Sequence, residues 1–242
     1  MNLTAREIKL IRSLSSKKAR EEAGLFVVEG EKMVSEALAS AFDVVQVYRK
    51  EDIGEESMSR ISAMSSTSPV LALVRIPEQR QLSIGNGLYL VLDTISDPGN
   101  FGTIIRLADW FGIEAVIAGK GTVELYNPKV IQASMGSIFR VSVFYSDIPE
   151  FCDSVLEAGG RLFGTFLDGE DLYRHELDDG EEHPSAVIIG NESAGISKEV
   201  AAKVTDRLFI PPYPSGGSGS ESLNAAIAAA VTVSEFRRRM TK

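Results

Sequence analysis

The sequence predicts an α/β protein in which a mainly parallel sheet is flanked by helices. Short apolar segments that read as strands alternate with amphipathic segments of helical period along nearly the whole chain of 242 residues. The alternation stops at residues 77–87, which are rich in Pro, Gln, Ser, Gly and Asn, and restarts beyond them. We therefore expect a small α/β domain over residues 1–76, a linker over 77–87 and a larger domain over 88–242.

The small domain is expected to begin with two short helices. Leu and Ile recur among charged residues at helical spacing over residues 4–22, and Leu14-Ser15-Ser16 interrupts the pattern. The elements expected after them are a strand at 26–28, a helix after Gly30, a strand at 43–48, a polar helix or loop at 51–64 and a strand at 70–74.

The larger domain repeats the alternation with longer apolar runs, which is typical of strands buried on both faces. The expected strands are 88–92, 114–118, 140–144, 161–166, 186–190 and 207–210. The expected helices are 102–111, 128–135, 148–158, 197–202 and 222–239. Strands that alternate with helices in this way predict parallel pairing.

Charge is unevenly placed along the chain. The net charge of −9 argues against a protein that binds nucleic acid without regard to sequence. Residues 1–80 hold twelve basic and twelve acidic side chains, so the remainder carries the whole negative excess. The first 20 residues are locally basic, and Lys17, Lys18 and Arg20 are candidates for phosphate contact. A solvated helical face is the alternative interpretation.

Cysteine and histidine are scarce. A single cysteine, Cys152, excludes an internal disulfide, and with only His175 and His183 a Cys/His zinc site has too few ligands, so no metal is expected. No run approaches the roughly 20 apolar residues of a membrane helix, and the polar N-terminus lacks the apolar core of a signal peptide. We expect a cytoplasmic protein.

The strand at 88–92 leads into a candidate site. Asp97-Pro98-Gly99-Asn100 reads as a turn, and the helix after it carries Arg106. Open α/β sheets bind ligands where strands end and helices start. Taken alone, the segment is explained as well by a structural turn as by a ligand site, and Arg106 by a salt bridge on the helix face with Asp109 or another acid.

Two later segments place polar residues after strands in the same way. Glu192 lies on the turn after the strand that ends at Gly190, where it can orient a partner or cap the next helix. Ser222 is expected to be the N-cap of the last helix. Asn224 would then lie inside an Ala-rich helix, where its amide is better suited to a polar ligand.

Together the three segments resemble the motifs of the SpoU, or TrmH-like, RNA ribose methyltransferases of the SPOUT superfamily. The motifs are Asn-x-Gly-x-x-x-Arg at 100–106, Gly-Asn-Glu-x-x-Gly at 190–195, and Ile-Pro followed by Ser-Leu-Asn within 210–224. Residues 24–30 resemble the substrate-binding domain of that family. Two departures are Pro212 after Ile-Pro, with a longer loop at 213–221, and Ala225-Ala226-Ile227 after the last motif.

The resemblance implies a trefoil knot, an S-adenosylmethionine cofactor, and homodimers whose sites border the subunit interface. The implied cofactor-binding residues are Gly190, Ile210, Leu223 and Thr165. The implied catalytic residues are Arg106, Asn100, Glu192, Ser222 and Asn224. Because a guanidinium is hard to deprotonate, we expect Arg106 to position the reacting oxygen and stabilise its charge.

The expected function is methylation of a ribose 2′-hydroxyl in structured RNA, with Lys17, Lys18 and Arg20 as RNA contacts. Ribosomal RNA is favoured because a separate N-terminal domain resembles the branch of the family that acts on rRNA. The alternatives are a tRNA 2′-O-methyltransferase, a knotted base methyltransferase, and a non-catalytic RNA-binding or ribosome-assembly factor on the same fold.

Overall fold

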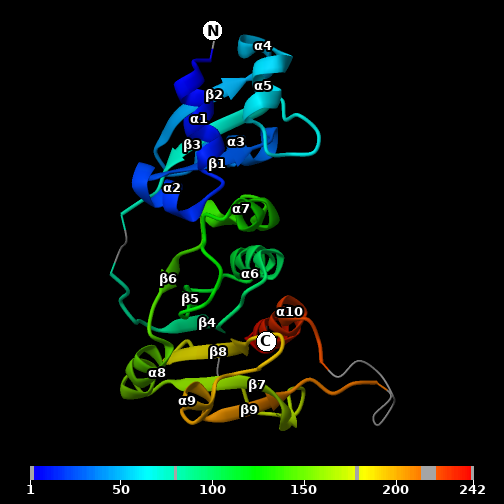
Figure 1. Ribbon diagram of the computed structural model, residues 1–242. Helices are drawn as coiled ribbons and strands as arrows, with labels where there is room; N and C mark the ends of the chain where they lie inside the picture. Colours follow the sequence, from blue (N-terminus) through cyan, green and yellow to red (C-terminus); the bar gives the residue numbers. More distant parts are fainter. Residues whose placement is uncertain (1–2, 79–80, 178–179, 214–221, 241–242) are drawn as a thin grey trace. The chain divides into compact units, whose positions relative to one another are not determined.

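The computed structural model describes residues 3–78, 81–177, 180–213 and 222–240. The chain forms two compact units. Unit 1 contains Met1–Arg80 together with Glu124–Arg140, and unit 2 contains Gln81–Val123 together with Val141–Lys242. Figure 1 colours the chain from blue at the N-terminus to red at the C-terminus.

Unit 1 is built on a three-stranded antiparallel sheet in the order β1-β3-β2. Its strands are β1 (Leu25–Glu29), β2 (Val44–Arg49) and β3 (Val70–Arg75). Its helices are α1 (Ala5–Ser13), α2 (Lys17–Ala23), α3 (Glu31–Ala39), α4 (Lys50–Ile53), α5 (Glu55–Ile61) and α7 (Pro128–Ser134), with a 3₁₀ turn at Ser137–Phe139. The break that the sequence predicts between the first two helices is confirmed, and Leu14 at the break is buried.

Residues 124–140 join the core of unit 1, although the sequence analysis assigned them to the larger domain. The ring of Tyr126 stacks on Phe26 of β1 at a centroid distance of 4.6 Å. Ile131 and Ile138 are buried in the same cluster as Phe26 and Val34. Local helical period predicts α7 itself correctly, but it carries no information on which core the apolar face of the helix joins.

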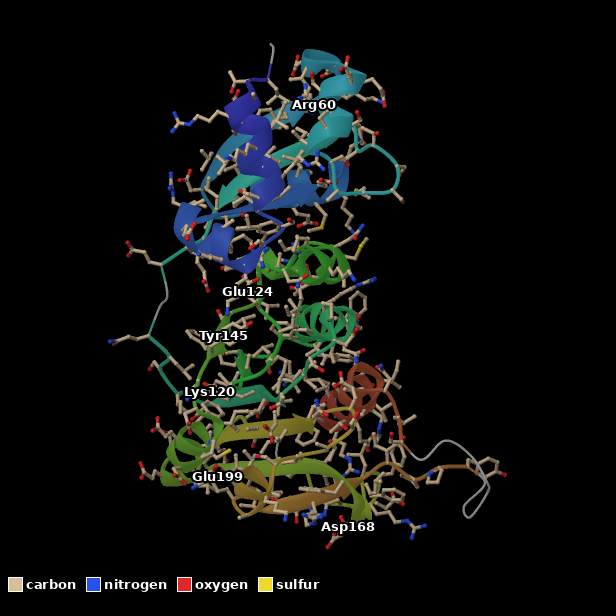
Figure 2. The ribbon with its side chains drawn as sticks, viewed as in Figure 1. Arg60, Lys120, Glu124, Tyr145, Asp168 and Glu199 are labelled. Carbon is tan, nitrogen blue, oxygen red and sulfur yellow. The ribbon has the colours of Figure 1, made fainter. Side chains whose placement is uncertain are left out.

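Arg20 is a structural residue, which corrects its assignment as an RNA contact. Its side chain is buried, with 2% of the residue exposed, and its guanidinium donates to the carbonyls of Leu14 and Ser15 at 2.8 and 3.0 Å. It also forms an ion pair with Glu124, which Figure 2 labels. A buried guanidinium needs such partners because it cannot shed its charge. Arg20 therefore ties the α1–α2 connection to the 124–140 segment.

Unit 2 contains the six-stranded parallel sheet, in the order β6-β5-β4-β8-β7-β9. Its strands are β4 (Gly87–Asp93), β5 (Val116–Ala118), β6 (Val143–Tyr145), β7 (Arg161–Asp171), β8 (Pro184–Gly190) and β9 (Asp206–Phe209). Its helices are α6 (Pro98–Trp110), α8 (Ile148–Glu157), α9 (Lys198–Ala201) and α10 (Ala225–Met240). The prediction of a parallel sheet flanked by helices is confirmed for this unit.

Helices cover both faces of the parallel sheet. Figure 1 shows α6 and α10 side by side on one face and α8 and α9 on the other. Tyr89 of β4 faces Phe151 of α8, with ring centroids 5.7 Å apart. On the opposite face, Phe163 of β7 packs edge-on against Phe236 of α10 at 5.0 Å. Strand side chains alternate between faces, so a strand covered on both sides is apolar throughout.

Two helices start at residues other than those expected. Helix α6 begins at Pro98, earlier than predicted, because the Asp97 side chain caps it by accepting from the Asn100 amide at 2.7 Å. Proline suits a first helical position because its missing N–H has no partner there. Asn100 therefore lies in the first turn of α6. Helix α10 begins at Ala225, later than predicted.

The described residues contain neither a membrane-spanning helix nor a cluster of metal ligands. None of their helices is long and apolar enough to cross a membrane. Their His, Cys, Asp and Glu side chains form no group of three or more that is arranged to hold a metal ion.

A histidine lies between two carboxylates beside β7 and β9. His175 Nδ1 is 2.8 Å from Glu170 Oε2, and its Nε2 is 2.8 Å from Asp206 Oδ1. Arg161 donates to the same Asp206 oxygen, and Arg239 of α10 donates to the His175 carbonyl. Burial lowers the pKa of His175, but the hydrogen bonds to Glu170 and Asp206 outweigh burial and raise the pKa above its ordinary value.

We expect the substitution His175→Gln to lower the free energy of unfolding by about 1.5 kcal/mol near pH 6. Because the folded pKa is raised, this stabilisation is complete below the unfolded pKa of about 6.5 and is lost as the pH rises through the folded value. Thermal unfolding of both proteins across this pH range measures the difference. A difference that grows with pH would contradict the assignment.

Candidate functional site

The candidate site lies at the carboxyl edge of the parallel sheet. Strands β4 and β8 are neighbours in register, with Asp93 opposite Gly190 at their ends. The chain after β4 enters α6, which carries Asn100 and Arg106, and the chain after β8 enters the turn that carries Glu192. Parallel strands deliver their outgoing connections to one edge, which brings these segments together.

Three side chains from the three motifs form one hydrogen-bonded chain. Asn100 Nδ2 donates to Glu192 Oε1 at 2.8 Å. Asn224 Nδ2 donates to Asn100 Oδ1, also at 2.8 Å. The residues are separated by 92 and 124 positions in the sequence, so only the fold joins them. The structure thus brings together Asn100, Glu192 and Asn224 of the five expected catalytic residues.

Asn224 is also the N-cap of α10, which corrects the expectation that Ser222 has this role. Asn224 Oδ1 accepts from the amides of Ala226 and Ile227 at 3.0 and 3.3 Å. Asparagine is among the preferred N-caps because its side-chain oxygen reaches the free amides of the first turn. Ser222 is exposed two residues earlier in the chain. Asn224 therefore serves the helix with its oxygen and the site with its nitrogen.

Glu192 is presented by a compact turn. Asn191 and Gly195 exchange backbone hydrogen bonds at 3.0 and 2.9 Å, which closes the turn on itself. A side chain at Gly190 would overlap the backbone of Gly195, so glycine is required there by packing. Helix α9 has Ser197 as its N-cap. Glu192 therefore contacts Asn100 and does not cap α9, which was the alternative that the sequence allowed.

Arg106 is exposed on α6, and its positive charge is unpaired among the described residues. Its side chain makes no hydrogen bond or ion pair with the residues that the structure describes, so the salt bridge to Asp109 considered from the sequence is absent. An exposed guanidinium offers several donors in a planar fork that matches phosphate and hydroxyl oxygens.

The expected cofactor residues lie on three neighbouring strands. Gly190 ends β8 and Ile210 follows β9 directly, and β7 lies between these strands. Thr165 is within β7, and its hydroxyl donates to the Ile188 carbonyl at 3.3 Å. Leu223 is 49% exposed before α10. The longer loop noted at 213–221 falls, apart from its first residue, outside the described residues.

The site includes residues that the sequence analysis did not assign. Asn191 Nδ2 donates to the Thr94 carbonyl at 2.8 Å, and Asp93 Oδ2 accepts from the Ser197 amide at 2.6 Å. Asn191 lies within the second motif, so its position was a usable signal. Asp93 and Thr94 have no such signal, because the Asp93 carboxylate and the Thr94 carbonyl meet their partners only in the folded chain.

Comparison with known protein families identifies the family of this chain. The sequence profile of the SpoU rRNA Methylase family matches residues 87–234, which include all three motifs. The chain belongs to the SpoU methylase family. A second profile, the MRM3-like substrate binding domain, matches residues 5–75.

Individual SpoU relatives match over nearly the full chain. The 23S rRNA (guanosine(2553)-2′-O)-methyltransferase RlmP of Bacillus subtilis is 30% identical, with 96% of each chain covered. Among solved structures, a TrmH-family protein from Porphyromonas gingivalis has a TM-score of 0.88 at 37% identity, covering 98% of this chain and 99% of that one. An AdoMet-bound rRNA methyltransferase from Sinorhizobium meliloti has a TM-score of 0.88 at 27% identity, covering 100% and 99%.

The capping role of Asn224 in this SpoU chain is testable by stability alone. We expect Asn224→Ala to lower the free energy of unfolding by about 1 kcal/mol, because two first-turn amides lose their acceptor. Asn224→Ser keeps an acceptor and should cost less. Ser222→Ala is the matched control, since it leaves the cap in place. Urea unfolding measures all three, and a larger loss for Ser222→Ala than for Asn224→Ala would reject the assignment.

Proposed function

We propose that this protein transfers a methyl group from S-adenosylmethionine to a ribose 2′-hydroxyl of structured RNA, with ribosomal RNA as the preferred substrate. The observation that carries the proposal is the Glu192–Asn100–Asn224 chain, which joins the three SpoU motifs next to α6 and its uncommitted Arg106. Full-length similarity to proteins named as rRNA methyltransferases supports ribosomal RNA over transfer RNA.

The residues at the ends of β7, β8 and β9 suit S-adenosylmethionine. Gly190 and Ile210 offer backbone groups at the ends of the strands on either side of β7, and the half-exposed Leu223 offers apolar surface for an adenine ring. The Thr165 hydroxyl is engaged with Ile188, so we assign Thr165 a backbone contact. When bound, the cofactor supplies a methyl group on a positively charged sulfur. The similarity to an AdoMet-bound structure supports this choice.

Arg106 is assigned to the reacting oxygen. Transfer requires that the 2′-oxygen be held in line with the methyl group and that its developing negative charge be stabilised. The guanidinium is charged and exposed, and no described residue competes for it. Because a guanidinium is not readily deprotonated in proteins, Arg106 holds and stabilises the oxygen and does not take up the proton.

The polar chain is assigned to orientation of the site. A carboxylate only accepts hydrogen bonds, so Glu192 forces the Asn100 amide to present its nitrogen to Glu192 and its oxygen to Asn224. The position of α10 is thereby linked to the first turn of α6, two turns before Arg106. Ser222, which precedes α10, is assigned to the ribose or to the cofactor loop.

We assign RNA binding to residues 1–76 and methyl transfer to residues 88–242, joined by the linker at 77–87. Arg6, Lys9 and Arg12 are exposed on one face of α1, and their side chains have no hydrogen bond or ion pair with the described residues. Lys17 and Lys18 are exposed on α2 and pair with Glu21 and Glu22 across one helical turn. Such exposed pairs contribute little and exchange readily for phosphate. Together the five cations form a basic surface, termed here the α1–α2 surface.

We also infer a knot and a homodimer. The chain leaves the edge strand β9 and returns to α10, which packs on α6 and β8, and a return that threads a loop forms a trefoil knot. Trp110 of α6 is 84% exposed and Ile227 of α10 is 52% exposed. Large exposed apolar side chains on adjacent helices are typical of protein interfaces, which supports association of two copies through α6 and α10. Sedimentation of the purified chain measures its mass directly.

The function is tested by incubating the protein with methyl-labelled S-adenosylmethionine and ribosomal RNA, followed by digestion to nucleosides. We expect label on the ribose that is retained when the base is released. Label released with the base would indicate a base methyltransferase, and RNA binding without cofactor binding would indicate a non-catalytic factor. Mapping 2′-O-methylation in cells with and without the gene identifies the nucleotide.

We expect Arg106→Ala to reduce methyl transfer by at least about 100-fold, because an electrostatic contact to the reacting oxygen is lost. Affinity for S-adenosylmethionine and the unfolding temperature should stay near those of the wild-type protein, since Arg106 has no described partner. Arg174→Ala is the control, because Arg174 is exposed in the same unit and forms an ion pair with Asp171. Near-normal turnover in Arg106→Ala would exclude the assignment.

Neutralising the α1–α2 surface should weaken RNA binding and flatten its salt dependence. We expect the triple variant Arg6→Gln/Lys9→Gln/Arg12→Gln, and to a smaller extent Lys17→Gln/Lys18→Gln, to lower the slope of log affinity against log salt by about 1 per lost phosphate contact. Filter binding at several salt concentrations gives the slope. Lys50→Gln, at a paired and exposed lysine of the same unit, is the control. Unchanged slopes in both variants would reject this surface.

A further inference from the structure

Thr94, the first residue after β4, has an unusual backbone conformation. Its φ is +68°, and among the described residues only Met135 shares a positive φ without being glycine. A β-branched residue is strained in this region, at a cost of about 1–3 kcal/mol, and keeps it only where its surroundings enforce it. Such strain is concentrated at functional sites, which points to a functional role for the contacts of Thr94.

Thr94 and its neighbour Asp93 hold both ends of the turn that presents Glu192. The Thr94 carbonyl accepts from Asn191 Nδ2 at 2.8 Å, where the turn begins. The buried Asp93 accepts from the Ser197 amide at 2.6 Å, where the turn ends. Two adjacent residues at the end of β4 thus bond to both ends of residues 191–197.

Asn191 transmits this constraint into the turn. While its nitrogen donates to Thr94, its Oδ1 accepts from the amides of Ser193 and Ala194 at 2.9 and 3.0 Å. The Asn191 side chain therefore both stabilises the turn internally and attaches it to the residue that follows β4. Glu192 lies between these fixed points, and in this arrangement of the turn its carboxylate reaches Asn100.

The loop after β5 holds Thr94 in its strained conformation. The Thr94 hydroxyl is 3.3 Å from the carbonyl of Lys120, which Figure 2 labels. The Thr94 methyl group lies against Gly121, which has a φ of +92°. Both faces of the threonine side chain are thus used, one polar and one apolar, and the carbonyl is left directed at Asn191.

We propose that Thr94 is a positioning residue that sets Glu192 against Asn100 through Asn191. The strained backbone directs the Thr94 carbonyl to Asn191, Asn191 orders the turn, and the turn places the Glu192 carboxylate where it orients the Asn100 and Asn224 amides. Thr94 contacts neither substrate nor cofactor in this role. The inference rests on the proposed function for its catalytic consequence, while its structural part stands on the hydrogen bonds alone.

Asn191→Asp is the sharpest variant. The new carboxylate still accepts from the Ser193 and Ala194 amides, but it faces the Thr94 carbonyl with an acceptor in place of a donor. We expect kcat to fall at least about tenfold through misplacement of Glu192, while KM for RNA and Kd for S-adenosylmethionine change less than about twofold. Steady-state kinetics and calorimetry separate these quantities.

Two substitutions of Thr94 make a matched pair. Thr94→Asn should retain most of kcat, because asparagine tolerates a positive φ better than other residues that have a side chain beyond Cβ. Thr94→Val keeps the shape and the backbone strain but loses the hydroxyl that bonds to the Lys120 carbonyl, so the strained conformation is no longer held and kcat should fall as in Asn191→Asp. Equal kcat in both Thr94 variants would overturn the proposal, as would joint loss of kcat, cofactor affinity and thermal stability in all three.

Amide hydrogen exchange separates this proposal from the proposed function. We expect exchange of the Gly195 amide, which donates to the Asn191 carbonyl in the closed turn, to accelerate at least about tenfold in Asn191→Asp. If the wild-type protein transfers no methyl group to any RNA, the proposed function fails and this measurement still decides the positioning role. Unchanged exchange would overturn the role whether or not the protein is active.

Discussion

The arrangement of the candidate site depends on one carboxylate, that of Glu192. Because it can only accept, it fixes the Asn100 amide with nitrogen toward Glu192 and oxygen toward Asn224. Asn224 must then present its nitrogen to Asn100, which leaves its oxygen for the first-turn amides of α10. A single negative charge thus determines the orientation of two amides and the start of a helix. Every hydrogen bond in the chain points toward Glu192.

The hydrogen bonds that join Glu192, Asn100 and Asn224 can form only because of the order of the strands. Strands β4 and β8 are adjacent and end at the same level, so the first two motifs meet directly. The third motif follows β9, two strands from β8, and reaches the site because α10 returns to pack against α6 and β8. Ala225, Ala226 and Ala229 are buried in α10, and their small side chains permit a close approach of the helix to its neighbours. The Ala-rich composition of α10 therefore allows Asn224, at its start, to reach the site.

Some charged side chains of this protein stabilise the fold, and others remain available to bind a ligand. Arg20 is buried and bonded to two carbonyls and Glu124, so it contributes to the fold of unit 1. Arg106 is exposed and has no partner among the described residues. The residue type is the same, and the surroundings decide the use. In the proposed mechanism the fixed polar chain orients the site, and the free guanidinium meets the charge that develops on the reacting oxygen.

The sequence by itself determined the parallel sheet of unit 2, most helices and strands, and the three motifs, because apolar period and motif spacing are local properties. The hydrogen bonds from Asn100 to Glu192 and Asn224, the strain at Thr94 and the burial of Arg20 were decided only by the tertiary structure. So were the antiparallel sheet of unit 1, the grouping of α7 with it, and the choice of Asn224 over Ser222 as N-cap. Each depends on groups far apart in the chain, whose approach is fixed by packing and by the need to satisfy buried polar atoms.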